Sequence, residues 1–193
     1  KPGINTVADL KGKTVCVGDV GSGTEINAWQ VLGAAGLTKD DVNAVNGSFQ
    51  DGVDQLKDGK IDAAFTVAGA PTTAIVDYAT TNTLNLVSLS DDELAAIQEA
   101  YPFLIRDDLA AGTYTGQDND ANTFGVKCLI IVTADMDADL VYDLCKAMNE
   151  HTEELAAGNA LLKDMTDPSF LCTQMPIPLH DGAQKYYSEQ GLI

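Results

Sequence analysis

Apolar, strand-sized runs alternate with helical patterns along the first hundred residues, and this alternation constrains the fold more than any other feature of the sequence. Residues 13–19 and 61–68 form two such runs, and each is followed by a glycine turn and then by a helical pattern. Residues 84–89 are predicted to form a third strand. Because strands separated by helices are typical of parallel βαβ units, the sequence predicts an α/β fold with a parallel sheet.

Capping residues set the predicted helix boundaries in this half. Helices are expected over 24–35, from Ser48 to a stop at Gly59, and from Pro71 at a first helical position to about residue 79. Two S/T-x-x-D/E patterns predict further helix starts. These are Thr6 with Asp9 and Ser90 with Glu93.

The second half begins after a polar connection over 107–123, where we place a domain boundary. Residues 124–133 have the strongest strand pattern in the chain, and a short helix is expected over 182–190. A long helix is predicted over 139–157. Its apolar stripe consists of Leu140, Leu144, Met148, His151 and Leu155.

Charge excludes two classes of partner. The 193 residues carry 11 Lys and Arg against 29 Asp and Glu, a net charge of −18. A nucleic-acid binder needs a basic surface, and an anionic membrane would repel this chain. No apolar stretch reaches the length of a membrane span, and no targeting peptide is visible in a chain that starts at Lys1. We therefore expect a mature, processed protein or a piece of a longer one.

The four cysteines, Cys16, Cys128, Cys145 and Cys172, have no C-x-x-C spacing and no nearby histidine. Metal binding is therefore not predicted. Cys16 and Cys128 lie in β-rich apolar runs and are expected to act as small buried hydrophobes. For Cys145 and Cys172, the sequence leaves open whether the two thiols pair.

Two glycine turns are the strongest candidates for a binding site in this sequence. The turn Gly21-Ser22-Gly23-Thr24 lacks the lysine of a phosphate loop and the third glycine of the dinucleotide fingerprint. It still leads from a strand into a helix N-terminus, where N–H groups attract anions. Gly69-Ala70-Pro71 repeats this design. Together the turns can hold a carboxylate without arginine; the alternatives are helix capping by the hydroxyls and a merely tight second turn.

No catalytic constellation is visible. His151 lies on the apolar stripe, and His180 is typical of a turn or helix cap. Neither has a paired nucleophile. Asp135, Asp137 and Asp139 lack the glycine of a calcium loop and indicate a helix start. We expect a protein that is not an enzyme and that needs no cofactor.

Five motifs follow one another along the chain. They are 7–13 (VADLKGK), 17–25 (VGDVGSGTE), 68–75 (AGAPTTAI), 111–118 (AGTYTGQD) and 175–187 (MPIPLHDGAQKYY). VADLKGK alone is common, whereas the combination of GTYTGQD with IPLHDGAQKYY is specific. In this order the motifs resemble the TAXI-type solute-binding subunits of tripartite ATP-independent periplasmic (TRAP) transporters.

This resemblance implies a type II periplasmic-binding-protein-like clamshell. Residues 1–112 would form its second lobe, and 113–193 the inter-lobe crossing and the C-terminal part of the first. The protein would be extracytoplasmic, either periplasmic or a lipid-anchored lipoprotein. It would capture a small carboxylate or glutamate-like amino acid and deliver it to membrane permease subunits. The implied ligand-binding residues are Gly21, Ser22, Gly23, Thr24, Ala68, Gly69, Ala70, Pro71, Thr113 and Tyr114.

The chain departs from the family pattern at two places. It begins almost at VADLKGK, where members carry a further N-terminal section, so we expect half of the cleft to be absent. The strand at 124–133 would then lack neighbours and expose an apolar edge, which predicts self-association. Asp19-Val20 also replaces a more usual small residue and proline. A ligand-sensing domain and an enzyme on the same fold stay open as alternatives.

Overall fold

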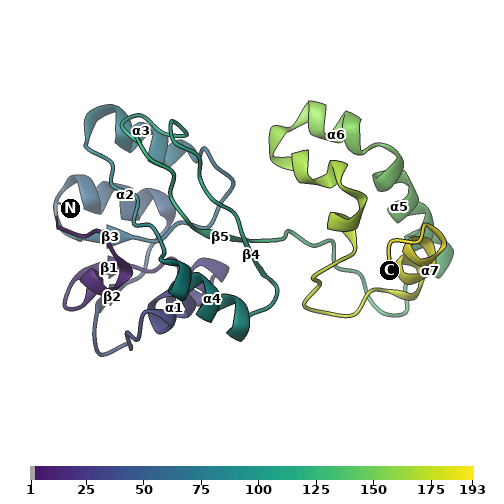
Figure 1. Cartoon of the computed structure of the whole chain (residues 1–193), viewed down its shortest axis with the longest axis horizontal. Helices are drawn as coiled ribbons and strands as arrows, with labels where there is room; N and C mark the ends of the chain where they lie inside the picture. Colours follow the sequence, from purple (N-terminus) through teal and green to yellow (C-terminus); the bar gives the residue numbers. More distant parts are fainter. Residues whose placement is uncertain (1–2) are drawn as a thin grey trace. The chain divides into compact units, whose positions relative to one another are not determined.

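The computed structural model describes residues 3–193 (Figure 1). They fall into two compact units, which meet in the sequence between Val126 and Lys127. This point lies later in the chain than the predicted lobe boundary at 112/113, and the division into clamshell lobes stays a prediction.

The first unit is built on a small parallel sheet, as the alternating pattern predicts. Its strands are β1 (Thr14–Cys16), β2 (Asn43–Val45) and β3 (Ala63–Ala64), in the spatial order β2-β1-β3. Both pairings are parallel. The central and third strands lie inside the predicted runs but are shorter, whereas β2 was not predicted because its short, mostly exposed sequence has no apolar run.

Helices flank this sheet, and Figure 1 shows α1 and α4 on one side of it and α2 and α3 on the other. The two predicted capping boxes are present at Thr6 and Ser90, and the predicted helix start at Ser48 has one as well. The helices of this unit are the 3₁₀ helix η1 (Val7–Leu10), α1 (Gly23–Ala34), α2 (Phe49–Lys57), α3 (Thr73–Thr81) and α4 (Asp91–Ala100).

The core of this unit follows the two-residue period of β1. Val15 is completely buried in a cluster with Leu32 of α1 and Ile97 of α4. The intervening Cys16 lies next to Gly52 of α2. The sheet is therefore covered on both faces, which is the arrangement expected of parallel sheets.

The prediction of a strand over 84–89 is wrong: these residues belong to no strand and have no regular secondary structure. Leu89 is buried, and its backbone N–H donates to the Asn122 carbonyl at 3.0 Å. Burial thus explains the apolar pattern, while the backbone contacts a loop instead of a sheet.

The predicted strand over 124–133 forms only in part. β5 (Phe124–Val126) pairs antiparallel with β4 (Leu104–Arg106), and the register begins at Leu104 opposite Val126. Beyond Val126 the chain continues without secondary structure to residue 133. β5 ends at Val126 because β4 has only three residues with which it can pair. The strand propensity of the apolar run that follows does not extend the strand without a partner.

The second unit is helical and has a small core. Its elements are α5 (Ala138–Glu150), α6 (Thr152–Gly158), the 3₁₀ helices η2 (Ala160–Thr166) and η3 (Pro168–Leu171), and α7 (Asp181–Glu189). Val141 of α5 is buried with Tyr186 and Tyr187 of α7. The predicted helix over 139–157 is therefore two helices, interrupted at His151.

The predicted apolar stripe of that helix is not a core face. Leu140 is 59% exposed, and Leu144 and Leu155 are also exposed. The neighbouring Val141 is buried instead, because α7 packs on its side of α5.

The four cysteines are all free thiols, so the Cys145–Cys172 pair is not formed in this structure. Cys16 is buried as predicted, but Cys128 is exposed because its segment lies outside the β4–β5 pairing. Within residues 3–193, no helix is long and apolar enough to cross a membrane.

Candidate functional site

The first glycine turn leaves β1 and enters α1. Gly18 adopts φ +100°, a conformation that favours glycine. Its carbonyl oxygen accepts hydrogen bonds from the Asn46 side-chain amide at 2.8 Å and from the Gly47 N–H at 3.2 Å. The turn is therefore fixed to the segment that follows β2.

The N-terminus of α1 is partly satisfied by its own residues. Ser22 is the N-cap, and its hydroxyl accepts the Glu25 N–H at 3.1 Å, as the capping alternative predicts. The Glu25 carboxylate accepts the Gly21 N–H at 2.7 Å and the Asn46 amide at 3.1 Å. These bonds, that from Gly21 foremost, lower the pKa of Glu25, so this turn already holds an ionised carboxylate.

Two backbone donors at this terminus stay available. The N–H groups of Gly23 and Thr24 make no hydrogen bond with any residue from 3 to 193. Gly23 is exposed, whereas Thr24 is 6% exposed and packs its side chain beneath Gly18. First-turn N–H groups of this kind are the donors that bind anions at helix N-termini.

The second glycine turn leads into α3, although one residue differs from its predicted place. Pro71 is not the first helical residue, because Thr72 is the N-cap and the helix begins at Thr73. The Thr72 hydroxyl donates to the Gly69 carbonyl at 3.1 Å. Ala68, Gly69 and Pro71 are exposed to solvent.

Tyr114 lies at this second turn. Its hydroxyl accepts the Thr72 N–H at 3.0 Å, although 42 residues separate the two in sequence. The side chain is 4% exposed. Thr113 does not join it, because its hydroxyl donates to the Ala110 carbonyl within its own loop at 2.7 Å. The structure therefore places Tyr114, but not the Thr113 hydroxyl, against the predicted turn.

The two turns lie at the same edge of the sheet. β1 and β3 are parallel neighbours, with Cys16 opposite Ala64 at their carboxyl ends. Ligands of open parallel sheets bind outside this edge. The edge here presents exposed glycines and helix N-termini, a combination suited to a small carboxylate.

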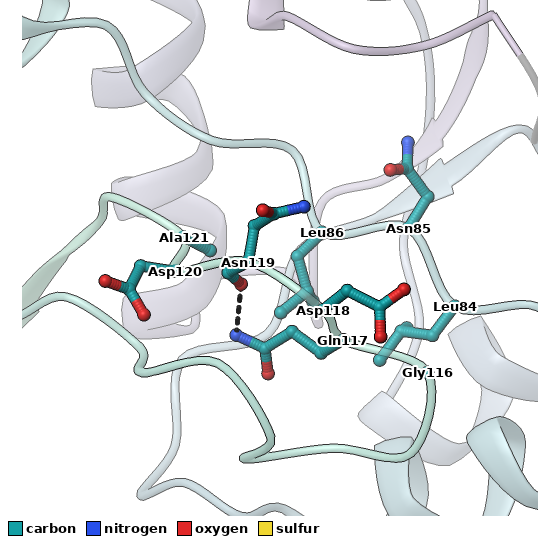
Figure 2. Close-up of a pocket in the computed structure, with 9 residues that line it drawn as sticks. All are labelled: Leu84, Asn85, Leu86, Gly116, Gln117, Asp118, Asn119, Asp120 and Ala121. Atoms are coloured by element: carbon teal, nitrogen blue, oxygen red, sulfur yellow. Dashed lines mark hydrogen bonds between the residues drawn. The ribbon is translucent and has the colours of Figure 1, made fainter.

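A pocket of about 170 Å³ lies elsewhere in the first unit (Figure 2). Its wall includes the carboxylates of Asp118 and Asp120, and the Gln117 amide donates to the Asn119 carbonyl at 3.1 Å. Such a wall disfavours an anion, so this pocket is not the predicted carboxylate site. The lining residues are Leu84, Asn85, Leu86, Gly116, Gln117, Asp118, Asn119, Asp120 and Ala121.

The sequence predicts no pocket here: residues 84–86 belong to the predicted strand over 84–89, and residues 116–121 belong to the polar connection over 107–123. The single signal was the density of Asp and Asn over 118–122. That composition is equally typical of turns, so it did not distinguish a pocket from a loop.

Neither histidine belongs to a catalytic constellation in the part of the chain that the structure describes. His151 pairs with Glu154 at 3.2 Å on the surface. His180 caps α7 as predicted, with Nδ1 accepting the Gly182 N–H at 3.2 Å. Residues 3–193 also contain no group of three or more His, Cys, Asp and Glu side chains placed to hold a metal ion.

A comparison with protein-family models gives one match across nearly the whole chain. The model of the NMT1-like family, a solute-binding-protein-like family whose members are generally non-catalytic, matches residues 1–191. The small parallel sheet with helices on both faces agrees with a lobe of the periplasmic-binding-protein type. The chain therefore belongs to the NMT1-like family.

Proposed function

We propose that this protein is an extracytoplasmic solute-binding component of a TRAP transporter, which captures a small amino acid and delivers it to membrane permease subunits. The proposed class of ligand rests on one observation. Two exposed glycine turns lie at one edge of the parallel sheet, and each leads into the N-terminus of a helix. Family membership supports a small solute as ligand. The transporter assignment rests on the motif resemblance described above.

The ligand carboxylate is assigned to the first turn of α1. The N–H groups of Gly23 and Thr24 are the unused donors there. Two such donors and the positive end of the helix dipole would stabilise the charge of a carboxylate without a basic side chain. Tyr114 contributes to the second turn by fixing Thr72 through its hydroxyl.

Glu25 favours an amino acid over a simple carboxylic acid. Its carboxylate lies at the same turn and is ionised at neutral pH, since its pKa is lowered by the bonds from Gly21 and Asn46. A ligand with only negative charge would be repelled there, whereas an ammonium group beside the ligand carboxylate would be attracted. The carboxylate and ammonium groups of an amino acid together meet both requirements.

Titration calorimetry against amino acids and small carboxylates tests the proposal. In the variant Gly23→Pro, one N–H donor is lost at a helix position that tolerates proline, and Ser22 already has the extended backbone that precedes proline (ψ 158°). Loss of a hydrogen bond to a charged group costs about 1.5–3 kcal/mol, so affinity should fall roughly ten- to hundredfold.

Asp91→Pro is the matched control, because Asp91 is the first residue of α4 and likewise follows a serine N-cap (ψ 160°). This variant should bind as the wild type does. An absence of binding heat with every amino acid and carboxylate, or equal losses in both proline variants, would contradict the proposal.

The variant Glu25→Gln tests the role of the ammonium group. Affinity for an amino acid should fall, while affinity for the same acid without its amino group should rise, because the repulsive charge is removed. Parallel losses for both ligands would show that Glu25 serves only to hold the turn.

A further inference from the structure

The segment Cys128–Val132 is apolar and pairs with no strand within residues 3–193. Its five residues, CLIIV, carry no charge, and Ile130 and Ile131 are 64% and 74% exposed. The backbone groups of these five residues make no hydrogen bond with any residue from 3 to 193. The main chain of this segment is therefore open to pairing, and Cys128, Ile130 and Ile131 expose their side chains. Leu129 and Val132 are half-buried, and Val132 packs against the core of the second unit.

Such a segment is a template for another strand. Unpaired N–H and C=O groups beside apolar side chains favour the addition of a strand from a second molecule. β-Branched residues such as Ile130, Ile131 and Val132 have high strand propensity, which lowers the cost of ordering the pair.

We infer that two copies of this chain associate through antiparallel pairing of their 128–132 segments. The charges at the two ends of the segment favour a second copy of the chain as the partner and an antiparallel direction of pairing. Lys127 precedes the apolar run and Asp135 follows it. Antiparallel pairing brings each lysine towards the partner's aspartate, whereas parallel pairing would place like charges together.

The hydrogen bonds already made by the flanking residues indicate the register. The Thr133 carbonyl already accepts the Met136 N–H at 3.1 Å. In an antiparallel pair, alternate residues along each strand form the hydrogen bonds between the strands. The odd-numbered set, which includes Thr133, is therefore less free to form these bonds. The even-numbered residues can form it when Ile130 lies on the two-fold axis, with Cys128 of one copy opposite Val132 of the other. Lys127 of one copy is then opposite Thr133 of the other, where the turn that carries Asp135 begins.

Lys127 retains the capacity for this contact. Its ammonium donates to the carbonyls of Phe170 and Thr173 at 2.8 and 2.9 Å. An ammonium has three donors, so one is left for the partner's carboxylate. The uncharged segment also lets two chains of net charge −18 meet without opposing carboxylates in its centre.

Sedimentation velocity over a range of concentrations is the first test. The wild type should reach twice the chain mass of 20.3 kDa. Ile130→Lys should weaken association at least tenfold, since the two new charges meet on the axis. Leu161→Lys is the control, because Leu161 is 57% exposed on η2 of the same unit and its variant should associate like the wild type. A wild type that stays monomeric, or an Ile130→Lys variant that still dimerises, would overturn the inference.

Cysteine cross-linking tests the register independently. In a Cys128→Ser background, Ile130→Cys should give a disulfide-linked dimer under mild oxidation, because position 130 faces itself across the axis. Leu161→Cys in the same background should stay uncross-linked, and the three remaining native cysteines are common to both variants. Equal yields of linked dimer in the two variants would exclude this pairing.

Discussion

At the residue scale, Gly18 shows how the first turn depends on one backbone conformation. Its φ of +100° is one that side chains disfavour, and a Cβ atom there would lie 2.8 Å from the Thr24 Cβ and 3.1 Å from the Glu25 backbone nitrogen. Any other residue would therefore strain the backbone and displace the first turn of α1.

We accordingly expect Gly18→Ala to lower the free energy of unfolding by about 2–4 kcal/mol, from strain at positive φ together with overpacking. Gly33→Ala is the control, because Gly33 lies inside α1 with open space around it, and alanine there should stabilise the protein by about 0.5–1 kcal/mol. Urea denaturation measures both. Equal stabilities for Gly18→Ala and the wild type would show that the turn relaxes freely.

Asp41 makes stability depend on acid pH. Its carboxylate accepts the Thr38 N–H at 2.9 Å and hydroxyl at 2.7 Å and pairs with Lys11 at 3.0 Å. The Thr38 N–H is the largest cause, and together these groups lower the pKa of Asp41 from 3.8 to about 2. Because the folded pKa lies below the unfolded one, the charged form stabilises the fold above pH 3.8, and this contribution disappears as the pH falls through 2.

The variant Asp41→Asn removes this titration. The difference in unfolding free energy between wild type and variant should be constant from neutral pH down to the unfolded pKa and should shrink between the two pKa values. Urea denaturation at a series of pH values measures it. A difference that stays constant below pH 2 would mean that the carboxylate charge is not the cause.

At the element scale, the packing of α5 against α7 depends on a close approach at Gly182. A Cβ atom at this position would collide with the Ala138 carbonyl oxygen and would lie 2.9 Å from the Tyr142 backbone nitrogen. Because both obstacles are backbone atoms, rotation of a side chain cannot relieve the collision. The two helices would have to separate, and the cluster of Val141, Tyr186 and Tyr187 lies between them.

Gly182→Ala should therefore destabilise the second unit by about 3 kcal/mol or more, at the upper end of overpacking effects. Amide hydrogen exchange of α5 and α7 would detect the loss of protection. Gly158→Ala is the control, since nothing lies within 4 Å of a Cβ atom at Gly158, the last residue of α6. Full protection of α7 in Gly182→Ala would contradict this account of the packing.

At the scale of the whole molecule, net charge opposes folding. A charge of −18 over 193 residues makes the compact chain repel itself more than the unfolded chain does. Salt screens this repulsion, since the Debye length falls from about 30 Å at 0.01 M to about 8 Å at 0.15 M. The acidic residues therefore limit stability at low ionic strength.

We expect the melting temperature at neutral pH to rise with sodium chloride over this range, as measured by calorimetry. The same series near the sequence pI of 4.1 is the control, because the net charge is then close to zero and the salt dependence should be small. A melting temperature that falls with salt at neutral pH would mean that favourable ion pairs outweigh the repulsion.

The sequence by itself determined the elements whose signals are local. The serines that precede α2 and α4 satisfy backbone N–H groups within three residues, so Ser48 and Ser90 predicted both helix starts. His180 likewise identified the start of α7. The alternation of apolar runs and helices was enough to predict a parallel sheet, because crossover helices are what join parallel strands.

Only the tertiary structure decided which apolar segments pair and which faces are buried. Residues 84–89 and 127–133 have strand composition but no partner strand in the described chain, and Leu140 is exposed while Val141 is buried. It also decided that Tyr114 bonds to Thr72, a contact across 42 residues. The physical reason is that a strand, a buried face and a shared hydrogen bond each require a second segment, and local sequence does not specify which segment folds against it.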